Sequence, residues 1–276
     1  MHALNTERAD GTGLKVTLRR LRPHDADAEP DGLWRESELL RLLASVGISA
    51  PQPIYLDAEG RHFGTPASVL SFIPGRVNAA ETNTGPWTDA LAATLMSIHA
   101  VTPATTDLSI LRAQDDRERI EDIAQHTDDS PFAQEIVSVL REHCERIAPL
   151  PPTLLHNDYW AGNTIWYRDR ITGVIDWLHA RVGDPRNDVS ECRSAMTYDH
   201  NEDVANEFLA AYERGLGRKL PDIWYFDLLR GIAAFLWYEF WLEGAADLGM
   251  QLDPVDTKAR ITAFLQRALE RSRASA

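Results

Sequence analysis

Residues 154–166 read LLHNDYWAGNTIW, and residues 175–177 read IDW. In this short stretch Asp158 is followed by Asn163 five positions later and then by an isolated aspartate, Asp176. Transfer of a phosphoryl group needs a side chain that orients the attacking hydroxyl and metal ions that neutralise the phosphate oxygens. Aspartate can orient the hydroxyl, and asparagine and aspartate supply the hard oxygen ligands that Mg²⁺ prefers. We therefore predict Asp158 as the catalytic residue and Asn163 and Asp176 as metal ligands.

Four neighbours of these residues are given less direct roles. We expect His156 to hold the loop through a ring hydrogen bond rather than to act as a base. Asp184 is predicted to support the same loop, although an aspartate before a proline also suits an ordinary turn. Ile165 and Ile175 fit either the apolar core or the floor beneath a nucleotide base.

Composition and charge narrow the class of protein. The chain has 276 residues, 44% hydrophobic and 25% charged, enough for one large domain or two lobes around a cleft. Its formal net charge of −14 disfavours nucleic acid and anionic membranes as partners, because both repel an acidic surface. Two cysteines make neither a disulfide framework nor a zinc site. No secretory pattern opens the sequence, so we expect a cytoplasmic protein, whose oligomeric state leaves no signal.

The predicted secondary structure changes near residue 75, from mostly strands to mostly helices. The segments predicted before this point are a β-hairpin, one helix and two strands, over residues 3–8 with 14–19, 33–46, 54–56 and 67–73. Helical patterns dominate afterwards, over residues 88–99, 130–147 and from 188 to the end, and residues 224–242 are read as one buried amphipathic helix. We predict an α+β fold of two lobes, with a small antiparallel sheet and one helix in 1–75 and a mainly helical lobe in 76–276.

The loop also resembles a known family. HNDYWAGN at residues 156–163, with IDW downstream, is similar to the catalytic loop and metal-binding aspartate of the aminoglycoside-phosphotransferase and choline-kinase family, whose loop usually reads HGDxxxxN. Further matches follow in the family's order, at LRR 18–20, RE 35–36, PQP 51–53, FIPG 72–75 and GDP 183–185 with Asp188. Six matches in order are far more specific than one. The resemblance covers most of the chain and implies a protein-kinase-like fold and a small-molecule kinase.

This resemblance implies ATP or GTP as the phosphoryl donor and Mg²⁺ as the cofactor. It places the basic residue that contacts phosphate at Arg19, where the family usually has lysine, and the acidic partner of that residue at Glu36. Arg20 is the alternative to Arg19, because a shift of one residue in register exchanges the two faces of a strand. Glu38 is the alternative to Glu36.

The nucleotide base is expected at the backbone near Ser71 and Phe72. The family's glycine-rich loop over the phosphates has no counterpart here, since Gly11 and Gly13 fall in the hairpin that would follow it. We therefore expect that the chain starts late and lacks the first strand of the small lobe. This departure favours a second hypothesis, a non-catalytic nucleotide- or small-molecule-binding protein with the same fold.

Two carboxylates are candidates for binding the acceptor, the molecule that would receive the phosphoryl group. Glu239 and Glu243 lie four residues apart in a segment rich in aromatic residues, and carboxylates beside aromatic rings suit an amine. A solvated helix face is the alternative interpretation. We expect the acceptor to be a hydroxyl on a cationic amine or aminoglycoside-like compound, with a neutral sugar or macrolide as the alternative.

Overall fold

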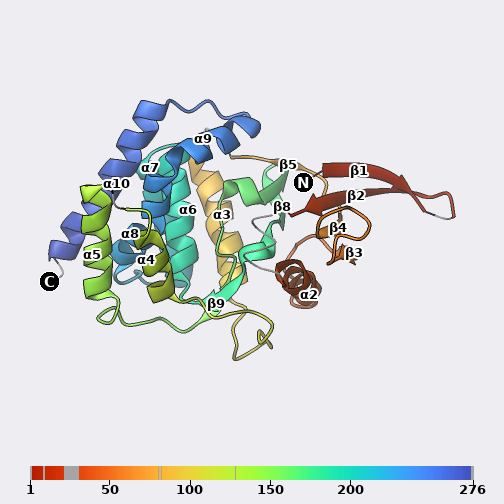
Figure 1. The fold of residues 1–276 in the computed structure, drawn as a ribbon, viewed down its shortest axis with the longest axis horizontal. Helices are drawn as coiled ribbons and strands as arrows, with labels where there is room; N and C mark the ends of the chain where they lie inside the picture. The colour runs from red at the N-terminus through yellow and green to blue at the C-terminus, as the bar shows by residue number, and fades with distance from the viewer. Residues whose placement is uncertain are drawn as a thin grey trace.

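The computed structural model describes residues 2–8, 10–21, 31–79, 81, 83–127 and 129–274. It is an α+β fold of two lobes, as the sequence predicts. Figure 1 shows the small lobe, with β1 to β4 and α2, beside a larger helical lobe that ends at the C-terminus. None of the helices, in the part of the chain that the structure describes, is long and apolar enough to cross a membrane.

The small lobe is one antiparallel sheet with one helix. Its strands are β1 (His2–Glu7), β2 (Gly13–Arg20), β3 (Pro53–Asp57) and β4 (Ala67–Ser71), in the spatial order β1-β2-β4-β3. Helix α2 (Gly32–Ser45) packs Leu39, Leu40 and Leu43 into the core, which is the apolar stripe at helical spacing in the sequence. The hairpin β1–β2 and the helix lie within one or two residues of their predicted bounds.

The chain passes between the lobes over residues 72–75. Strand β4 ends at Ser71, and β5 (Arg76–Val77) already pairs with β7 (Thr164–Tyr167), which pairs in turn with β8 (Arg170–Val174). Gly75 has a φ of +144°, and a Cβ built on it would lie 2.5 Å from the carbonyl oxygen of Trp166 and 2.7 Å from Ile165 Cγ2. Only glycine fits this position, because it tolerates positive φ and brings the two backbones close together.

Gly75→Ala should therefore destabilise the protein. The added methyl group meets backbone atoms that cannot rotate away, and the φ angle is unfavourable for alanine, so we expect the free energy of unfolding to fall by about 1–3 kcal/mol or more. Urea denaturation measures the change. Gly85→Ala is the matched control, because a Cβ there meets nothing within 4 Å. Equal stability of the two variants would contradict the expectation.

The large lobe is built from helices around two apolar clusters. Its helices are α3 (Thr84–His99), α4 (Asp116–Ala124), α5 (Pro131–His143), α6 (Arg186–Asp199), α7 (Glu202–Leu216), α8 (Ile223–Leu236), α9 (Tyr238–Asp247) and α10 (Pro254–Ala274). Helix α6 is buried along most of its length and packs against α7, α8 and α10. This burial makes α6 a fixed platform for polar residues that point out of it.

A short irregular segment lies between the helices and the small lobe. It contains β6 (Thr153–Leu155), the 3₁₀ turn η1 (Ala161–Asn163), the turn η2 (Trp177–His179) and β9 (Arg181–Gly183), which pairs with β6. The loop between β6 and η1 carries Asp158, and the junction of β8 and η2 carries Asp176. Both residues therefore stand at the ends of short strands, where neighbouring elements fix the backbone.

Three predictions of secondary structure need correction. The single helix predicted over 224–242 is divided at Trp237 into α8 and α9. The helix predicted over 130–147 ends at His143, where the last turn loosens before the prolines. Helix α4 was not predicted, because its surface is strongly polar and only Ile120 and Ile123 are buried. A short polar helix gives little periodic signal in the sequence, because packing against the rest of the protein provides most of its stability.

Candidate active site

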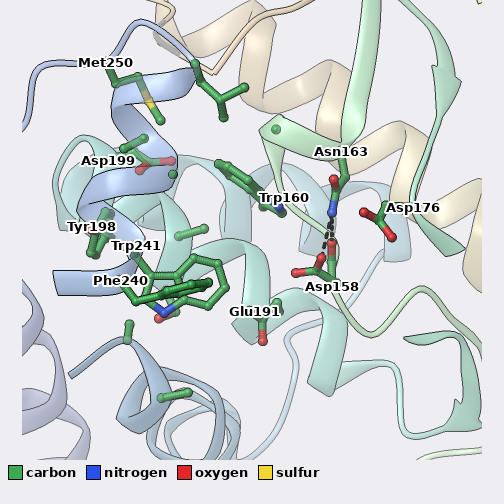
Figure 2. Close-up of a pocket in the computed structure, with 18 of the residues that line it drawn as sticks. Asp158, Trp160, Asn163, Asp176, Glu191, Tyr198, Asp199, Phe240, Trp241 and Met250 are labelled. Carbon is green, nitrogen blue, oxygen red and sulfur yellow. Dashed lines mark hydrogen bonds between the residues drawn. The ribbon is translucent and has the colours of Figure 1, made fainter. Parts of the chain in front are cut away.

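The loop after β6 brings Asp158 and Asn163 into contact. The Asn163 side-chain nitrogen donates to the Asp158 carbonyl oxygen at 2.8 Å and to its carboxylate oxygen Oδ2 at 2.9 Å. Figure 2 shows this pair with Asp176 beside it, at one end of a cavity. Asn157 and Asp176 both adopt left-handed backbone conformations, at φ of 65° and 67°. Strained backbone of this kind persists where surrounding contacts enforce it, and it is concentrated at functional sites.

The carboxyl group of Asp158 is electrostatically unusual. Burial, together with the nearby charges of Glu191 and Asp176, raises the pKa of Asp158 well above its ordinary value. The hydrogen bond from Asn163 and the charge of Arg230 oppose this shift. A carboxylate that holds its proton more tightly than usual is a better base once it is ionised.

Arg19 joins the two lobes at this point. Its guanidinium lies 2.6 Å from Glu36 Oε1 on α2 and 2.5 Å from Asp176 Oδ1. The structure thus pairs Arg19 with Glu36, whereas the alternative Arg20 is exposed and the alternative Glu38 pairs with Arg41. Glu36 Oε1 also accepts a hydrogen bond from the Trp177 backbone N–H at 3.1 Å.

Glu36 and Asp176 share the guanidinium of Arg19, but their pKa values shift in opposite directions. Burial raises the pKa of Glu36, and the Arg19 charge only partly offsets it. Burial would also raise the pKa of Asp176, but the Arg19 charge and hydrogen bond outweigh it and hold that pKa below its ordinary value. Asp176 is therefore the more strongly ionised of the two, which suits a ligand for a cation.

His156 is a structural residue of the loop. It is fully buried, and its ring Nε2–H donates to the carbonyl oxygen of Ile175 at 2.9 Å. Burial lowers the pKa of His156, so the ring is neutral and its Nδ1 is left without a partner among the described residues. The contact ties the Asp158 loop to the residue before Asp176, as expected of a supporting side chain.

The carboxylate that holds the loop is Asp188, and the expected support from Asp184 is not found. Asp188, fully buried on α6, accepts hydrogen bonds from the backbone N–H of His156 and of Asn157, both at 2.7 Å, and it lies 3.2 Å from His99 Nε2. Asp184 instead accepts from Leu150 N–H at 2.8 Å and pairs with the buried Arg186. Asp184 precedes α6 and, by its bond to Leu150, fixes the chain before β6.

Arg230 and Glu191 are site residues that the sequence analysis did not identify. Arg230, on α8, donates to the side-chain and backbone oxygens of Asn157 at 3.0 and 2.7 Å, and its Nε lies 2.5 Å from Glu191 on α6. The sequence did hold a signal, because an arginine inside the apolar run 224–236 needs a buried acceptor. Glu191 follows Asp188 by three residues and therefore shares a face of the helix with it.

Two cavities meet at Asp176. The smaller, of about 210 Å³, lies between the lobes and is lined by Ser71, Phe72, Ile165 and Ile175, the four residues expected around a nucleotide base, and also by Glu36. The Ser71 N–H donates to the carbonyl oxygen of Gln52, and the Ser71 hydroxyl oxygen accepts from the Gln52 N–H, both at 2.8 Å. Ile175 and Asp176 line both cavities, so the two cavities adjoin at these residues.

The larger cavity, of about 800 Å³, lies in the helical lobe. Its polar lining is mostly acidic, with Asp158, Asp176, Glu191, Asp199 and Glu243 against the single arginine Arg230. Aromatic residues complete the wall, namely Trp160, Tyr198, Phe240 and Trp241. Of the two carboxylates predicted for the acceptor, Glu243 lines this cavity, whereas Glu239 is exposed on α9 and does not.

Two kinases of known sequence are similar to this chain. A homoserine kinase of Nitrobacter winogradskyi is 29% identical over 195 residues, which cover 64% of this chain and 57% of that protein. Viomycin phosphotransferase of Streptomyces vinaceus is 28% identical over 210 residues, covering 66% of this chain and 68% of that protein. The chain thus spans a little over half to two thirds of the length of these relatives.

The fold is shared with solved kinases. The choline kinase of Streptococcus pneumoniae superposes with a TM-score of 0.65 at 16% identity, over 99% of this chain and 89% of that one, and a second structure of that kinase contains AMP. This confirms the protein-kinase-like fold. A model of the phosphotransferase enzyme family, which includes the aminoglycoside phosphotransferases, matches residues 3–226, from the first strand through the loop of Asp158 to α8. The chain therefore belongs to the phosphotransferase enzyme family.

Proposed function

We propose that this protein transfers the γ-phosphoryl group of ATP or GTP to a hydroxyl of a small molecule, with Mg²⁺ as cofactor. The observation that carries the proposal is the position of Asp158 and Asn163 in the larger cavity beside Asp176, which lines both cavities. A nucleotide in the smaller cavity directs its phosphates toward Asp176, and an acceptor in the larger one reaches Asp158. Family membership and the AMP in a relative of the same fold support the nucleotide.

The residues present fit a magnesium ion. Asn163 donates to Asp158 through its nitrogen, which leaves its amide oxygen available, and Asp176 uses one carboxylate oxygen for Arg19. Among the described residues, no three His, Cys, Asp or Glu side chains gather as a complete cage. Mg²⁺ is usually bound by one or two protein oxygens together with phosphate oxygens and water, so Asn163 and Asp176 would hold it with the nucleotide. Bound there, it would supply charge neutralisation at the phosphates.

The chain's own residues have separable tasks. Asp158 accepts or orients the proton of the acceptor hydroxyl, and its bond to Asn163 fixes the carboxylate in the cavity. Arg19, held by Glu36, contacts the phosphates, as its planar guanidinium binds two oxygens at once. Arg19 bonds to Asp176 in the structure, so nucleotide binding would require Arg19 to exchange that partner for phosphate. Residues 1–75 would then act as the nucleotide-binding lobe, and residues 76–276 would carry the catalytic loop and the acceptor site.

Nucleotide binding should stabilise the protein only when Mg²⁺ is present. A ligand that binds only the folded state raises the free energy of unfolding, by about 2.7 kcal/mol at a ligand concentration of 100 Kd, and therefore raises the melting temperature. We expect such a rise with ATP or GTP plus MgCl₂, and its loss in Asp176→Ala, because the metal then lacks one of its two protein ligands. Differential scanning fluorimetry measures both proteins under the four combinations of nucleotide and metal.

The controls separate the two hypotheses for this chain. Asp184→Ala alters a carboxylate that lies outside both cavities, so its nucleotide response should match the parent. A Mg²⁺-dependent rise without any phosphoryl transfer across an acceptor screen would favour the non-catalytic binding protein. No rise with either nucleotide would refute nucleotide binding by this chain.

We further propose that the acceptor is cationic. The larger cavity carries five carboxylates against one arginine, and that arginine is already held by Glu191 and Asn157. Aromatic walls stabilise an ammonium group through their π faces. In a screen that measures nucleoside diphosphate release, alcohols that bear amines should react in preference to neutral sugars and macrolides. Preference for a neutral acceptor would overturn this part of the proposal.

A further inference from the structure

Asn157, the residue before Asp158, has an unfavourable backbone conformation. Its φ of 65° lies in the left-handed region, which disfavours residues with a Cβ, although asparagine tolerates it better than most. Such a conformation persists where surrounding contacts enforce it. The peptide unit between Asn157 and Asp158 is planar, so the direction of the Asn157 carbonyl group fixes where the backbone of Asp158 begins. Contacts to this carbonyl group therefore affect the position of the Asp158 carboxylate.

Arg230 contacts this carbonyl group from α8. Its Nη2 donates to the carbonyl oxygen of Asn157 at 2.7 Å, and its Nη1 donates to the side-chain oxygen Oδ1 of the same residue at 3.0 Å. The third nitrogen, Nε, donates to Glu191 Oε2 at 2.5 Å. All three nitrogens are thus engaged, in the planar fork that a guanidinium offers and an ammonium group does not. Arg230 is only 3% exposed, so water competes little for these bonds.

Two reciprocal ion pairs join α8 to α6. Arg230 on α8 pairs with Glu191 on α6, and Arg193 on α6 pairs with Asp227 on α8. Arg193 donates from Nε and Nη2 to the two carboxylate oxygens of Asp227, both at 3.0 Å, and both side chains are almost completely buried. Asp227 and Arg230 stand three residues apart and therefore share a face of α8. The pair of Arg193 and Asp227 thus fixes the place of Arg230 without touching the loop.

Helix α6 holds Asn157 from two directions. Asp188 accepts the Asn157 N–H at 2.7 Å, and Glu191 holds the guanidinium that binds the Asn157 carbonyl oxygen. Figure 2 shows Glu191 at the same end of the larger cavity as Asp158. Both peptide groups of the residue before Asp158 are therefore fixed by buried or half-buried charged side chains of the helical lobe.

We propose that Arg230 is a positioning residue for phosphoryl transfer: it holds the peptide between Asn157 and Asp158 in the orientation that aims the Asp158 carboxylate at the acceptor hydroxyl. The proposal rests on Asp158 acting in the proposed phosphotransferase. A misplacement of about 1 Å at a reacting group can lower a rate by about 10²-fold. Arg230 also lines the larger cavity, so direct binding of the acceptor is the competing role that an experiment has to separate.

Hydrolysis of ATP without an acceptor separates the two roles. Water then replaces the acceptor hydroxyl and still needs Asp158, whereas Arg230 has no acceptor to bind. Arg230→Lys keeps the positive charge but cannot bind both Asn157 oxygens and Glu191 at once. We expect it to lower phosphate release from ATP with MgCl₂ by about 10²-fold. Stabilisation by nucleotide should remain, because Arg230 does not line the smaller cavity. Hydrolysis at the parental rate would overturn the proposal.

A double variant distinguishes positioning from general support of the fold. In Asp158→Asn the carboxylate is already absent, so adding Arg230→Lys should lower the residual hydrolysis by less than about twofold, because the two residues act as one unit. A residue needed only for folding would lower hydrolysis by the same factor in both backgrounds. Equal factors would therefore overturn the role of Arg230.

Arg193→Lys is the matched control. Arg193 is an equally buried arginine that joins the same two helices, but its bonds to Asp227 do not reach the loop. The variant should lower the melting temperature and leave hydrolysis per folded molecule near the parental level. If Arg230→Lys does not fold, Glu191→Ala tests the same contact, because the Glu191 side chain is only partly buried. Its hydrolysis should be about tenfold lower, and an unchanged rate would contradict the proposal.

Failure of the proposed function gives a different result. A parent that neither responds to nucleotide nor releases phosphate, with or without the acceptors of the screen, would refute the phosphotransferase and the role of Arg230 together. A parent that turns over nucleotide at a rate that Arg230→Lys leaves unchanged would refute the role of Arg230 alone.

Discussion

Asp158→Asn should lower the rate of phosphoryl transfer by a factor of about 10² to 10⁴, the usual contribution of a positioned general base. The variant keeps the shape of the side chain and its contact with Asn163, but an amide cannot take the proton of the hydroxyl. The measurement is steady-state turnover with an acceptor from the screen, and also nucleotide hydrolysis without acceptor, in which water replaces the hydroxyl.

Folding and nucleotide binding should survive this substitution. Burial and neighbouring charges raise the pKa of Asp158, so the ionised carboxylate weakens the fold, and the amide should be at least as stable. Mg²⁺-dependent stabilisation by nucleotide should remain in Asp158→Asn and disappear in Asp176→Ala. Turnover of Asp158→Asn near the parent level would show that Asp158 does not handle the proton.

Asp188→Ala should be the most destabilising single change in the site. The fully buried Asp188 carboxylate accepts the backbone N–H groups of His156 and Asn157, and its removal leaves both donors unsatisfied. Each unsatisfied buried donor costs about 1–3 kcal/mol, so we expect a loss of about 3–5 kcal/mol in the free energy of unfolding. Turnover should fall as well, because the backbone before Asp158 is no longer held.

The pH dependence of Asp188→Asn follows from the direction of its pKa shift. Burial alone would raise the pKa of Asp188, but the His99 interaction and the backbone donor outweigh it and hold it below the ordinary value. A lowered pKa stabilises the fold at neutral pH, and this stabilisation is lost as pH falls through the folded-state value. The parent should therefore exceed Asp188→Asn in stability at pH 7, and the difference should shrink on acidification.

Asp116→Asn provides the matched control in urea denaturation. Asp116 is a half-buried carboxylate in the first turn of a helix, and burial raises its pKa. A raised pKa stabilises the fold only at low pH and costs stability at neutral pH, so Asp116→Asn should be neutral or stabilising at pH 7. Equal losses in Asp188→Asn and Asp116→Asn would show that any buried carboxylate matters, rather than the contact with the loop.

Much of the small lobe and of the loop was predictable from local patterns. The apolar spacing of α2 predicts which face of that helix is buried. The alternation of β2 does not decide between Arg19 and Arg20, because Arg19 is buried on the face opposite Val16. Asp158 and Asn163 were both singled out by the motif, and they meet in the structure because the loop between them is short enough to close on itself. These features depend on contacts between residues close in sequence or on the period of one element.

Other features depend on how distant elements pack. The sequence analysis assigned the support of the loop to Asp184, and only the packing of α6 shows that Asp188 is the carboxylate that reaches it. Helices α8 and α9 are divided at Trp237, and Glu243 lines the larger cavity whereas Glu239 does not, which no local pattern in the sequence showed. Arg230 contacts Asn157 across 73 residues of sequence, and Arg19 contacts Asp176 across 157.

The sequence by itself therefore determined the two-lobed fold class and brought forward Asp158, Asn163 and Asp176 as the candidate residues, since these inferences follow from periodicity, short spacing and the motif. Only the tertiary structure decided which carboxylates hold the loop and which line the larger cavity. Their partners lie far along the chain, and the side on which a helix presents a charge depends on its orientation against its neighbours.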